Sequence, residues 1–274
     1  MITSEITTLF DKARNREIPL KIYHPKIEQV GTVIFSHGLG GSCESYKYYG
    51  EYLAAHGYKS IHPTHAGIDA ELLKEKRPFQ ALKAASEQHN NQIDPALDVK
   101  FVMDELGLEN IIMAGHSFGS YTTLLLAGQD VSKKGYGIDL SDKRLSQAIV
   151  MSPHAVLQNP EKAYDEIKIP ILHITGKFDD SPFGFFEPIQ RRIPFDNISC
   201  GNQYLVIFND ADHMVFAAQR RGNKFSAKDI TVMKLTCSAS LEFLKKYAQK
   251  ADSALDSPEF AATITPHAIF ERKI

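Results

Sequence analysis

Five short runs of β-branched and other apolar residues set the strongest limit on how this chain folds. The runs carry almost no charge, and longer segments with helical spacing of apolar residues separate them. A strand covered on both faces is expected to be apolar throughout, and strands that alternate with helices build parallel sheets from βαβ units. The pattern therefore predicts an α/β architecture. The five predicted strands are 32–35, 111–114, 148–151, 171–175 and 205–208.

The start and the end of the chain depart from this pattern. Segments 7–11 and 18–23 flank Arg14-Asn15-Arg16, which predicts an antiparallel hairpin at one edge of the sheet. The pair Asp94-Pro95 predicts a helix start, because an N-cap side chain and a proline at the first helical position both favour initiation. The tail beyond residue 252 is expected to be irregular.

The composition excludes several classes of protein. The chain has 274 residues, of which 43% are hydrophobic and 23% charged, so it can bury a large core without disulfides. A net charge of -2 gives no electrostatic basis for binding nucleic acid. Cys43, Cys200 and Cys237 have no zinc spacing and suggest reduced thiols. With neither a signal sequence nor a membrane-spanning run, a cytoplasmic location is expected. The sequence leaves the oligomeric state open.

Two longer stretches fit no simple element of such a sheet. We interpret the chain as one domain, 1–274, with insertions at about 66–92 and 181–201. The second insertion contains Phe183, Phe185 and Phe186, which we expect to line a substrate pocket. The alternative is a surface loop that packs its own aromatic rings.

The most specific motif is Gly115-His116-Ser117-Phe118-Gly119. It follows the predicted strand 111–114 and precedes a helical run, which is the context of a G-x-S-x-G nucleophile elbow. A serine on so sharp a turn has a strained backbone, and glycines two residues away on each side leave room for it. Ser117 is therefore the predicted nucleophile. The alternative is a serine that only caps a helix.

A second motif, His37-Gly38-Leu39-Gly40-Gly41, follows strand 32–35. Acyl transfer places negative charge on the former carbonyl oxygen, and two backbone N–H groups aimed at that oxygen stabilise it. One donor is expected to follow the nucleophile, which makes it Phe118. The other is expected from this glycine loop, at Leu39.

A serine nucleophile needs a base, and the base needs an acid that orients it. Downstream of Ser117, Asp179 and Asp180 follow strand 171–175, and His213 follows strand 205–208. Both positions lie past the carboxyl ends of strands, where open parallel sheets bind ligands. His213 is the predicted base and Asp179 the predicted acid, with Asp180 as the alternative.

The other histidines receive less direct interpretations. We expect His37 to order the glycine loop, His116 to pack under the elbow, and His173 to lie in the core. His62, His65 and Asp69 raise the possibility of a metal site, but a structural loop is preferred because the chain lacks H-x-H-x-D and H-E-x-x-H. His154 follows a strand end and is a candidate pocket residue.

These motifs, in this order, resemble those of the α/β-hydrolase superfamily over about residues 18–247. Within it, the chain resembles dienelactone-hydrolase-like and platelet-activating-factor-acetylhydrolase-like serine esterases, on Arg14-Asn15-Arg16, the His-Gly loop, the elbow and the segment Asp-His-Met-Val-Phe at 212–216. Two departures are a serine where dienelactone hydrolases have cysteine, and Ser120 where many relatives have glycine. The resemblance implies a central, mostly parallel sheet of about eight strands flanked by helices.

The combined hypothesis is a serine esterase that cleaves a small-molecule carboxylic ester through an acyl-Ser117 intermediate. No metal or organic cofactor is implied, and the short segment 154–168 predicts no large cap domain. Two alternatives stay open. A thioesterase or peptidase would use the same triad, and a non-catalytic protein of this fold would only bind a ligand.

Overall fold

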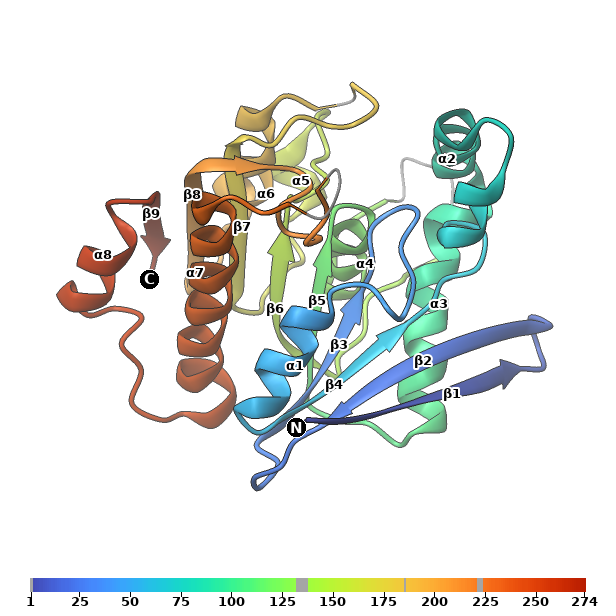
Figure 1. Cartoon of the computed structure of the whole chain (residues 1–274), viewed down its shortest axis with the longest axis horizontal. Coiled ribbons are helices and arrows are strands. Elements are labelled where there is room, and N and C mark those ends of the chain that lie inside the picture. Colours follow the sequence, from blue (N-terminus) through green and yellow to red (C-terminus); the bar gives the residue numbers. More distant parts are fainter. Residues whose placement is uncertain (1, 132–137, 185, 221–223) are drawn as a thin grey trace.

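One nine-stranded sheet runs through the chain (Figure 1). The computed structural model describes residues 2–131, 138–184, 186–220 and 224–274. The strand order is β1-β2-β4-β3-β5-β6-β7-β8-β9, and the pairs from β4 to β8 are all parallel. The strands are β1 (Thr3–Asp11), β2 (Arg16–His24), β3 (Gly31–Ser36), β4 (Tyr58–Pro63), β5 (Ile111–His116), β6 (Leu145–Met151), β7 (Ile171–Phe178), β8 (Gln203–Asp212) and β9 (Ala268–Lys273).

The two edges of the sheet are antiparallel. β1 and β2 form the predicted hairpin, in which Asp11 pairs with Arg16 beside the turn, and β2 continues antiparallel onto β4. At the other edge β9 pairs antiparallel with β8. The α/β fold predicted from the apolar runs is therefore confirmed, with a parallel centre and antiparallel borders.

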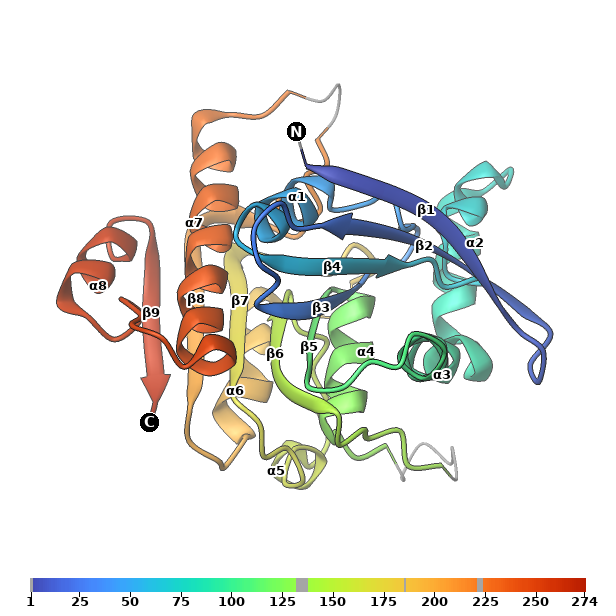
Figure 2. The ribbon, with the colours of Figure 1, turned by 90° about the horizontal axis from the view of Figure 1, so that it is seen from below.

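Helices cover both faces of the sheet, which explains why its central strands are apolar throughout. Alternate residues of these strands face opposite ways: Val33 and Phe35 pack with α1 (Lys47–Ala55) and α7 (Ala227–Leu244), whereas Ile34 packs with α3 (His89–Glu105) and α4 (Phe118–Ala127). Figure 2 shows α1 and α7 on one side of the sheet, and α3 and α4 on the other. The short helices α5 (Pro160–Ala163) and α6 (Ile193–Asn197) contribute to a smaller cluster on the α4 side.

The insertions lie near the carboxyl ends of the parallel strands. The first forms a 3₁₀ helix, η1 (Ala70–Lys74), and α2 (Pro78–Glu87), and the second includes η3 (Pro188–Arg192) and α6. In Figure 1 the arrows of β5 and β6 point upward, toward the end of the strands near which α2 lies. The segment between β6 and β7 holds only α5, in line with the predicted absence of a large cap.

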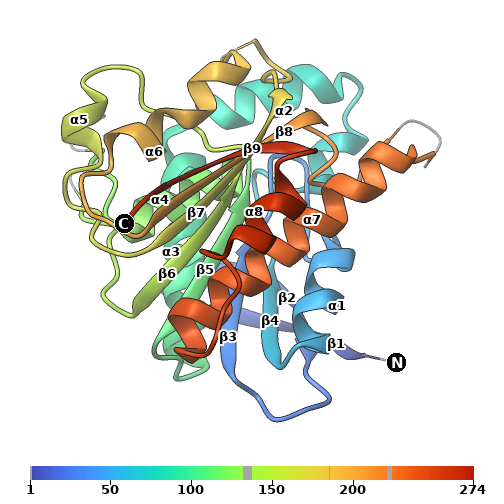
Figure 3. The same ribbon diagram turned by 90° about the vertical axis from the view of Figure 1, so that its left-hand side faces the viewer.

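The predicted irregular tail is wrong. After a π-helical turn, η5 (Lys245–Gln249), the tail forms α8 (Pro258–Ile264) and strand β9, both at the sheet edge seen in Figure 3. Ser257 caps α8 by accepting a hydrogen bond from the Phe260 N–H (3.1 Å). With β9 and with β4, which was not among the predicted runs, the sheet has nine strands rather than about eight.

The predicted helix start at Asp94-Pro95 is also wrong. Pro95 lies inside α3, which begins at His89. Tertiary contacts stabilise the extra turn: Asn91 Nδ2 donates to the carbonyls of Gly67 (3.1 Å) and Ala85 (3.0 Å), and so ties α3 to the first insertion. Ser226 caps the beginning of α7, where its hydroxyl accepts a hydrogen bond from the Asp229 N–H (3.1 Å).

Across the described residues, no helix combines the length and the apolar composition needed to cross a lipid bilayer.

Candidate active site

Ser117 occupies a sharp turn between β5 and α4. Its backbone has φ 54° and ψ -115°, in the left-handed half of conformational space that side chains rarely adopt. A Cβ atom added to Gly115 would lie 2.2 Å from the Gly119 oxygen, and one added to Gly119 would lie 1.9 Å from the Ser36 oxygen. Both glycines of the motif are therefore required by close backbone contacts, as the sequence predicted.

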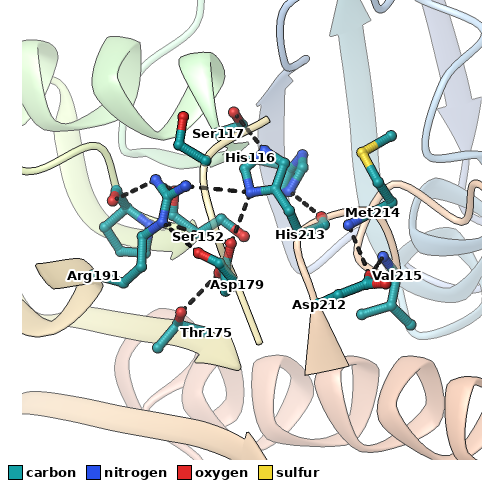
Figure 4. Close-up of polar contacts among 12 residues, drawn as sticks. His116, Ser117, Ser152, Thr175, Asp179, Arg191, Asp212, His213, Met214 and Val215 are labelled. Carbon is teal, nitrogen blue, oxygen red and sulfur yellow. Dashed lines mark hydrogen bonds and ion pairs between the residues drawn. The ribbon is translucent and has the colours of Figure 1, made fainter. Parts of the chain in front are cut away.

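Three side chains from three strand ends meet at this turn (Figure 4). His213 Nε2 lies 2.9 Å from Ser117 Oγ, and His213 Nδ1 lies 2.7 Å from Asp179 Oδ1. Asp179 follows β7 and His213 follows β8, so the parallel sheet brings the three residues together although they are far apart in sequence. This is the arrangement in which an imidazole can take a proton from the serine hydroxyl.

The carboxylate of Asp179 is buried and well held. Thr175 Oγ1 donates to its second oxygen, Oδ2, at 2.7 Å. Burial alone would raise the pKa of Asp179, but the hydrogen bond from His213 and the nearby charge of Arg191 outweigh it and lower the pKa to about 2. Asp180, the alternative acid, is exposed to solvent. The geometry thus places Asp179, and not Asp180, against His213.

Arg191 is a buried neighbour of these residues that sequence analysis missed. Only 2% of its surface is exposed, and its guanidinium donates to the carbonyl oxygens of Asp179 (3.2 Å), Ser152 (3.3 Å) and Pro153 (3.1 Å). Its Nη2 atom also lies 3.4 Å from His213 Nδ1. When Nδ1 donates its proton to Asp179, both nitrogens are donors, so this approach is a contact and not a hydrogen bond.

The glycine loop and the start of α4 present backbone N–H groups to the same space. Phe118 is the first residue of α4, so its N–H has no acceptor within the helix. The Leu39 N–H donates to no main-chain oxygen of the described residues. Both residues line the pocket that contains Ser117. The two predicted oxyanion donors therefore share one pocket with the predicted nucleophile.

This pocket has a volume of about 480 Å³ and a largely apolar wall. Rings of Phe79 and Phe183, one from each insertion, lie 4.7 Å apart between their centroids and join the two insertions. His154 and Phe186, two of the candidate substrate-pocket residues, also line it, whereas Phe185 lies outside the described residues. The apolar lining includes Leu39, Leu73, Phe79, Leu82, Phe118, Phe183, Phe186, Met214 and Ala217.

Several other histidines lie where their interpretations placed them. His116 packs below the elbow, with Nδ1 2.8 Å from the Tyr46 hydroxyl and Nε2 3.0 Å from the His213 carbonyl oxygen. His173 is buried in β7, 3.2 Å from Gln203. His62 contacts Ser60 (2.9 Å) and His65 contacts Ser36 (2.9 Å). No group of three or more potential metal ligands gathers among the described residues.

Buried neutral histidines are expected to make the fold sensitive to acid. Burial lowers the pKa of His37 and His62 to about 3 and that of His173 to about 4. Below about pH 6.5 the unfolded chain binds protons that the folded chain does not, so the free energy of unfolding falls as the pH falls. Each histidine should contribute about 1.4 kcal/mol per pH unit until the pH reaches its folded pKa.

Urea unfolding measured at several pH values between about 5 and 7.5 tests this sign and slope. A His173→Gln variant, which cannot titrate there, should show a slope shallower by up to about 1.4 kcal/mol per pH unit below about pH 6.5, and an unchanged slope above it. A free energy of unfolding that stays constant as the pH falls through this range would contradict the prediction.

Comparisons with known proteins agree with the fold. A family described as "alpha/beta hydrolase fold" matches residues 31–189, more than half of the chain. A comparison with curated proteins found no match by sequence. Among solved structures, a ferulic acid esterase from Streptomyces cinnamoneus is similar, with a TM-score of 0.66 and 16% identity over 99% of this chain and 96% of that one.

Two further structures show the same likeness at low identity. A dienelactone hydrolase from Anabaena variabilis has a TM-score of 0.60 and 14% identity, and the match covers 90% of this chain and 99% of that one. A cold-adapted esterase from an Arctic intertidal metagenomic library has a TM-score of 0.60 and 12% identity, over 90% and 94% of the two chains. At such identities the likeness extends to the fold alone.

Proposed function

The chain belongs to the α/β-hydrolase fold family, and from that premise we propose that it is a serine hydrolase of carboxylic esters. The observation that carries the proposal is the pair of short contacts from His213, to Ser117 Oγ (2.9 Å) and to Asp179 Oδ1 (2.7 Å), beside an apolar pocket. The esterases among its structural neighbours agree with this choice of reaction class.

The proposed reaction has two halves. Ser117 Oγ attacks the ester carbonyl carbon as its proton moves to His213 Nε2, and the N–H groups of Leu39 and Phe118 hold the oxyanion. The protonated His213 gives that proton to the departing alcohol, which leaves an acyl group on Ser117. Water then attacks the acyl carbon as His213 takes a proton from it, and the acid is released when Ser117 regains its hydrogen. Asp179 holds the imidazole in the required tautomer throughout.

The wall of the pocket disfavours an anionic substrate. Arg191 is the one Lys or Arg among its described lining residues, and Asp179 lies against that cation, with 3.5 Å between Arg191 Nε and Asp179 Oδ1. A carboxylate on the substrate would therefore find no free cation there, while losing its hydration. The same geometry suits a thioester or an activated amide, so these remain second candidates for the scissile bond.

A matched panel of aryl esters tests the proposal. We expect turnover of butyrate and benzoate esters, and a kcat/KM for the hemisuccinate ester about tenfold or more below that of the butyrate ester, because only the former buries a charge. Thioester and anilide analogues of the same acyl groups rank the scissile bonds. If the wild-type protein turns over none of these compounds, the enzyme proposal is refuted and a ligand-binding protein is favoured.

Arg191 is proposed as a positioning residue for the acid and the base. It joins the backbone that follows β6, at Ser152 and Pro153, to the backbone that carries Asp179. A guanidinium can serve these divergent acceptors at once because its five donors are fixed in a planar fork, which an ammonium group lacks.

Replacing Arg191 should therefore affect both stability and catalysis. Arg191→Met leaves the buried carboxylate without its cation and is expected to cost about 3–5 kcal/mol of stability. Its kcat, corrected for the folded fraction, should fall by about 10- to 100-fold because Asp179 is no longer fixed. Arg191→Lys keeps the charge but loses the fork, so an intermediate kcat is expected. Thermal unfolding and steady-state kinetics measure both effects, and equal kcat in all three proteins would exclude a positioning role.

A further inference from the structure

A second Ser–His–Asp arrangement lies inside the protein, at the end of β3. His65 Nε2 is 2.9 Å from Ser36 Oγ, and His65 Nδ1 is 3.0 Å from Asp98 Oδ2. The order of contacts is that of the Ser117 site, but each of the three residues has 0% of its surface exposed, and none of them lines a described pocket. No substrate can reach Ser36, so this arrangement has a role other than nucleophilic attack.

The buried carboxylate of Asp98 connects to the Arg14-Asn15-Arg16 turn, a motif that the proposed reaction does not use. Arg16 donates to it from Nε (2.7 Å) and Nη2 (3.1 Å), and Arg14 Nη1 lies 2.9 Å from Oδ1. Burial raises the pKa of Asp98, but the His65 contact and the charge of Arg16 outweigh it and keep the pKa below its usual value. The turn between β1 and β2 thereby holds α3 and His65 in one place.

His65 in turn fixes His37, the first residue of the glycine loop. The main-chain N–H of His65 donates to His37 Nε2 at 3.0 Å, so Nε2 must be the unprotonated nitrogen. The proton is therefore on Nδ1, which donates to the Gly38 carbonyl oxygen at 2.8 Å. Burial lowers the pKa of His37 to about 3, so the neutral ring and this tautomer persist at neutral pH.

The Gly38 carbonyl and the Leu39 N–H belong to the same peptide unit. The Gly41 N–H also donates to this carbonyl (2.9 Å), so two donors fix its direction. In a planar trans peptide the C=O and N–H bonds point in opposite directions, and the described residues contain no cis peptide. Fixing the Gly38 carbonyl therefore fixes where the Leu39 N–H points.

We propose that the chain of contacts Arg16–Asp98–His65–His37 positions the Leu39 N–H as an oxyanion donor. These are positioning residues, because none of them touches the reacting atoms. The inference rests on the proposed hydrolase function and adds to it a reason for the buried second triad. It assigns catalytic consequences to residues at the hairpin turn and in α3, outside the substrate pocket.

Asp98→Asn tests the proposal, with Asp104→Asn as the matched control. Asp104 lies on the same helix, but its side chain is 64% exposed and pairs with Arg144. Per active site titrated with a phosphonate, Asp98→Asn should lower kcat by about 10- to 100-fold with little change in KM, less than the loss of a whole donor. Affinity for a boronic acid, whose adduct with Ser117 is tetrahedral, should fall by a similar factor. Asp104→Asn should match the wild type in both.

A second variant guards against misfolding of the first. Arg16→Met removes the cation from the same carboxylate at the partly exposed turn, and should show the same paired losses to a smaller degree. The proposal is overturned if both variants keep the wild-type kcat and boronic acid affinity per titrated site. This includes the case in which the variants only lower the fraction of molecules whose active site reacts with the phosphonate. Wild-type turnover that does not depend on Ser117 would instead refute the proposed function itself.

Discussion

Ser117→Ala is expected to lower kcat for an ester substrate by at least about 10⁴-fold, because it removes the only atom that forms the acyl intermediate. The substitution removes one oxygen atom and leaves the rest of the pocket wall in place, so KM and the thermal midpoint should change little. Steady-state kinetics on purified protein, with calorimetry on the same sample, measure the two quantities separately.

Ser120→Ala is a suitable control for this experiment. The Ser120 hydroxyl donates to the Ser117 carbonyl oxygen at 2.6 Å, which makes it a structural neighbour on α4 rather than a second nucleophile. We expect it to retain most of the activity. If Ser117→Ala keeps activity within about tenfold of the wild type, another nucleophile does the chemistry and the account fails.

Asp179→Asn is expected to lower kcat by about 10⁴-fold while the fold persists. An amide at this position can donate a hydrogen bond to His213 Nδ1, which favours the tautomer whose Nε2 carries the proton and cannot accept one from Ser117. The neighbouring Asp180→Asn changes an exposed carboxylate and should leave kcat within about twofold.

The pair of aspartate variants decides between two assignments that sequence alone left open. A strong loss in Asp180→Asn together with a mild one in Asp179→Asn would reverse the assignment of the acid. Circular dichroism and the thermal midpoint of both proteins establish that the comparison concerns catalysis and not folding.

Sequence analysis found the strands whose residues are apolar throughout. β3, β5 and β6 are covered on both faces by helices, so burial demands an apolar run at each. β4 carries Lys59, Ser60 and His62, which interrupt such a run although Ser60 and His62 are buried. β9 contains three charged residues and is a strand because it pairs with β8 at an edge, which is a tertiary effect.

The candidate site likewise contains residues that the local sequence marks and a residue that it does not. Ser117, Asp179 and His213 follow strand ends in a motif order, and local sequence therefore marks them. Arg191 lies within a segment rich in proline and phenylalanine, and its significance depends on Ser152 and Asp179 meeting it in space. No spacing rule connects residues whose contacts arise only when separate loops fold together.

Covalent labelling of the protein with a fluorophosphonate tests the central claim most directly, since the probe reacts with a serine only where a base and an oxyanion site activate it. The account predicts one phosphonyl adduct per chain, located on the peptide that contains Ser117, with no labelling of Ser117→Ala and much slower labelling of Asp179→Asn. A folded wild-type protein that takes up no label, or whose label lies on another residue, would contradict the account.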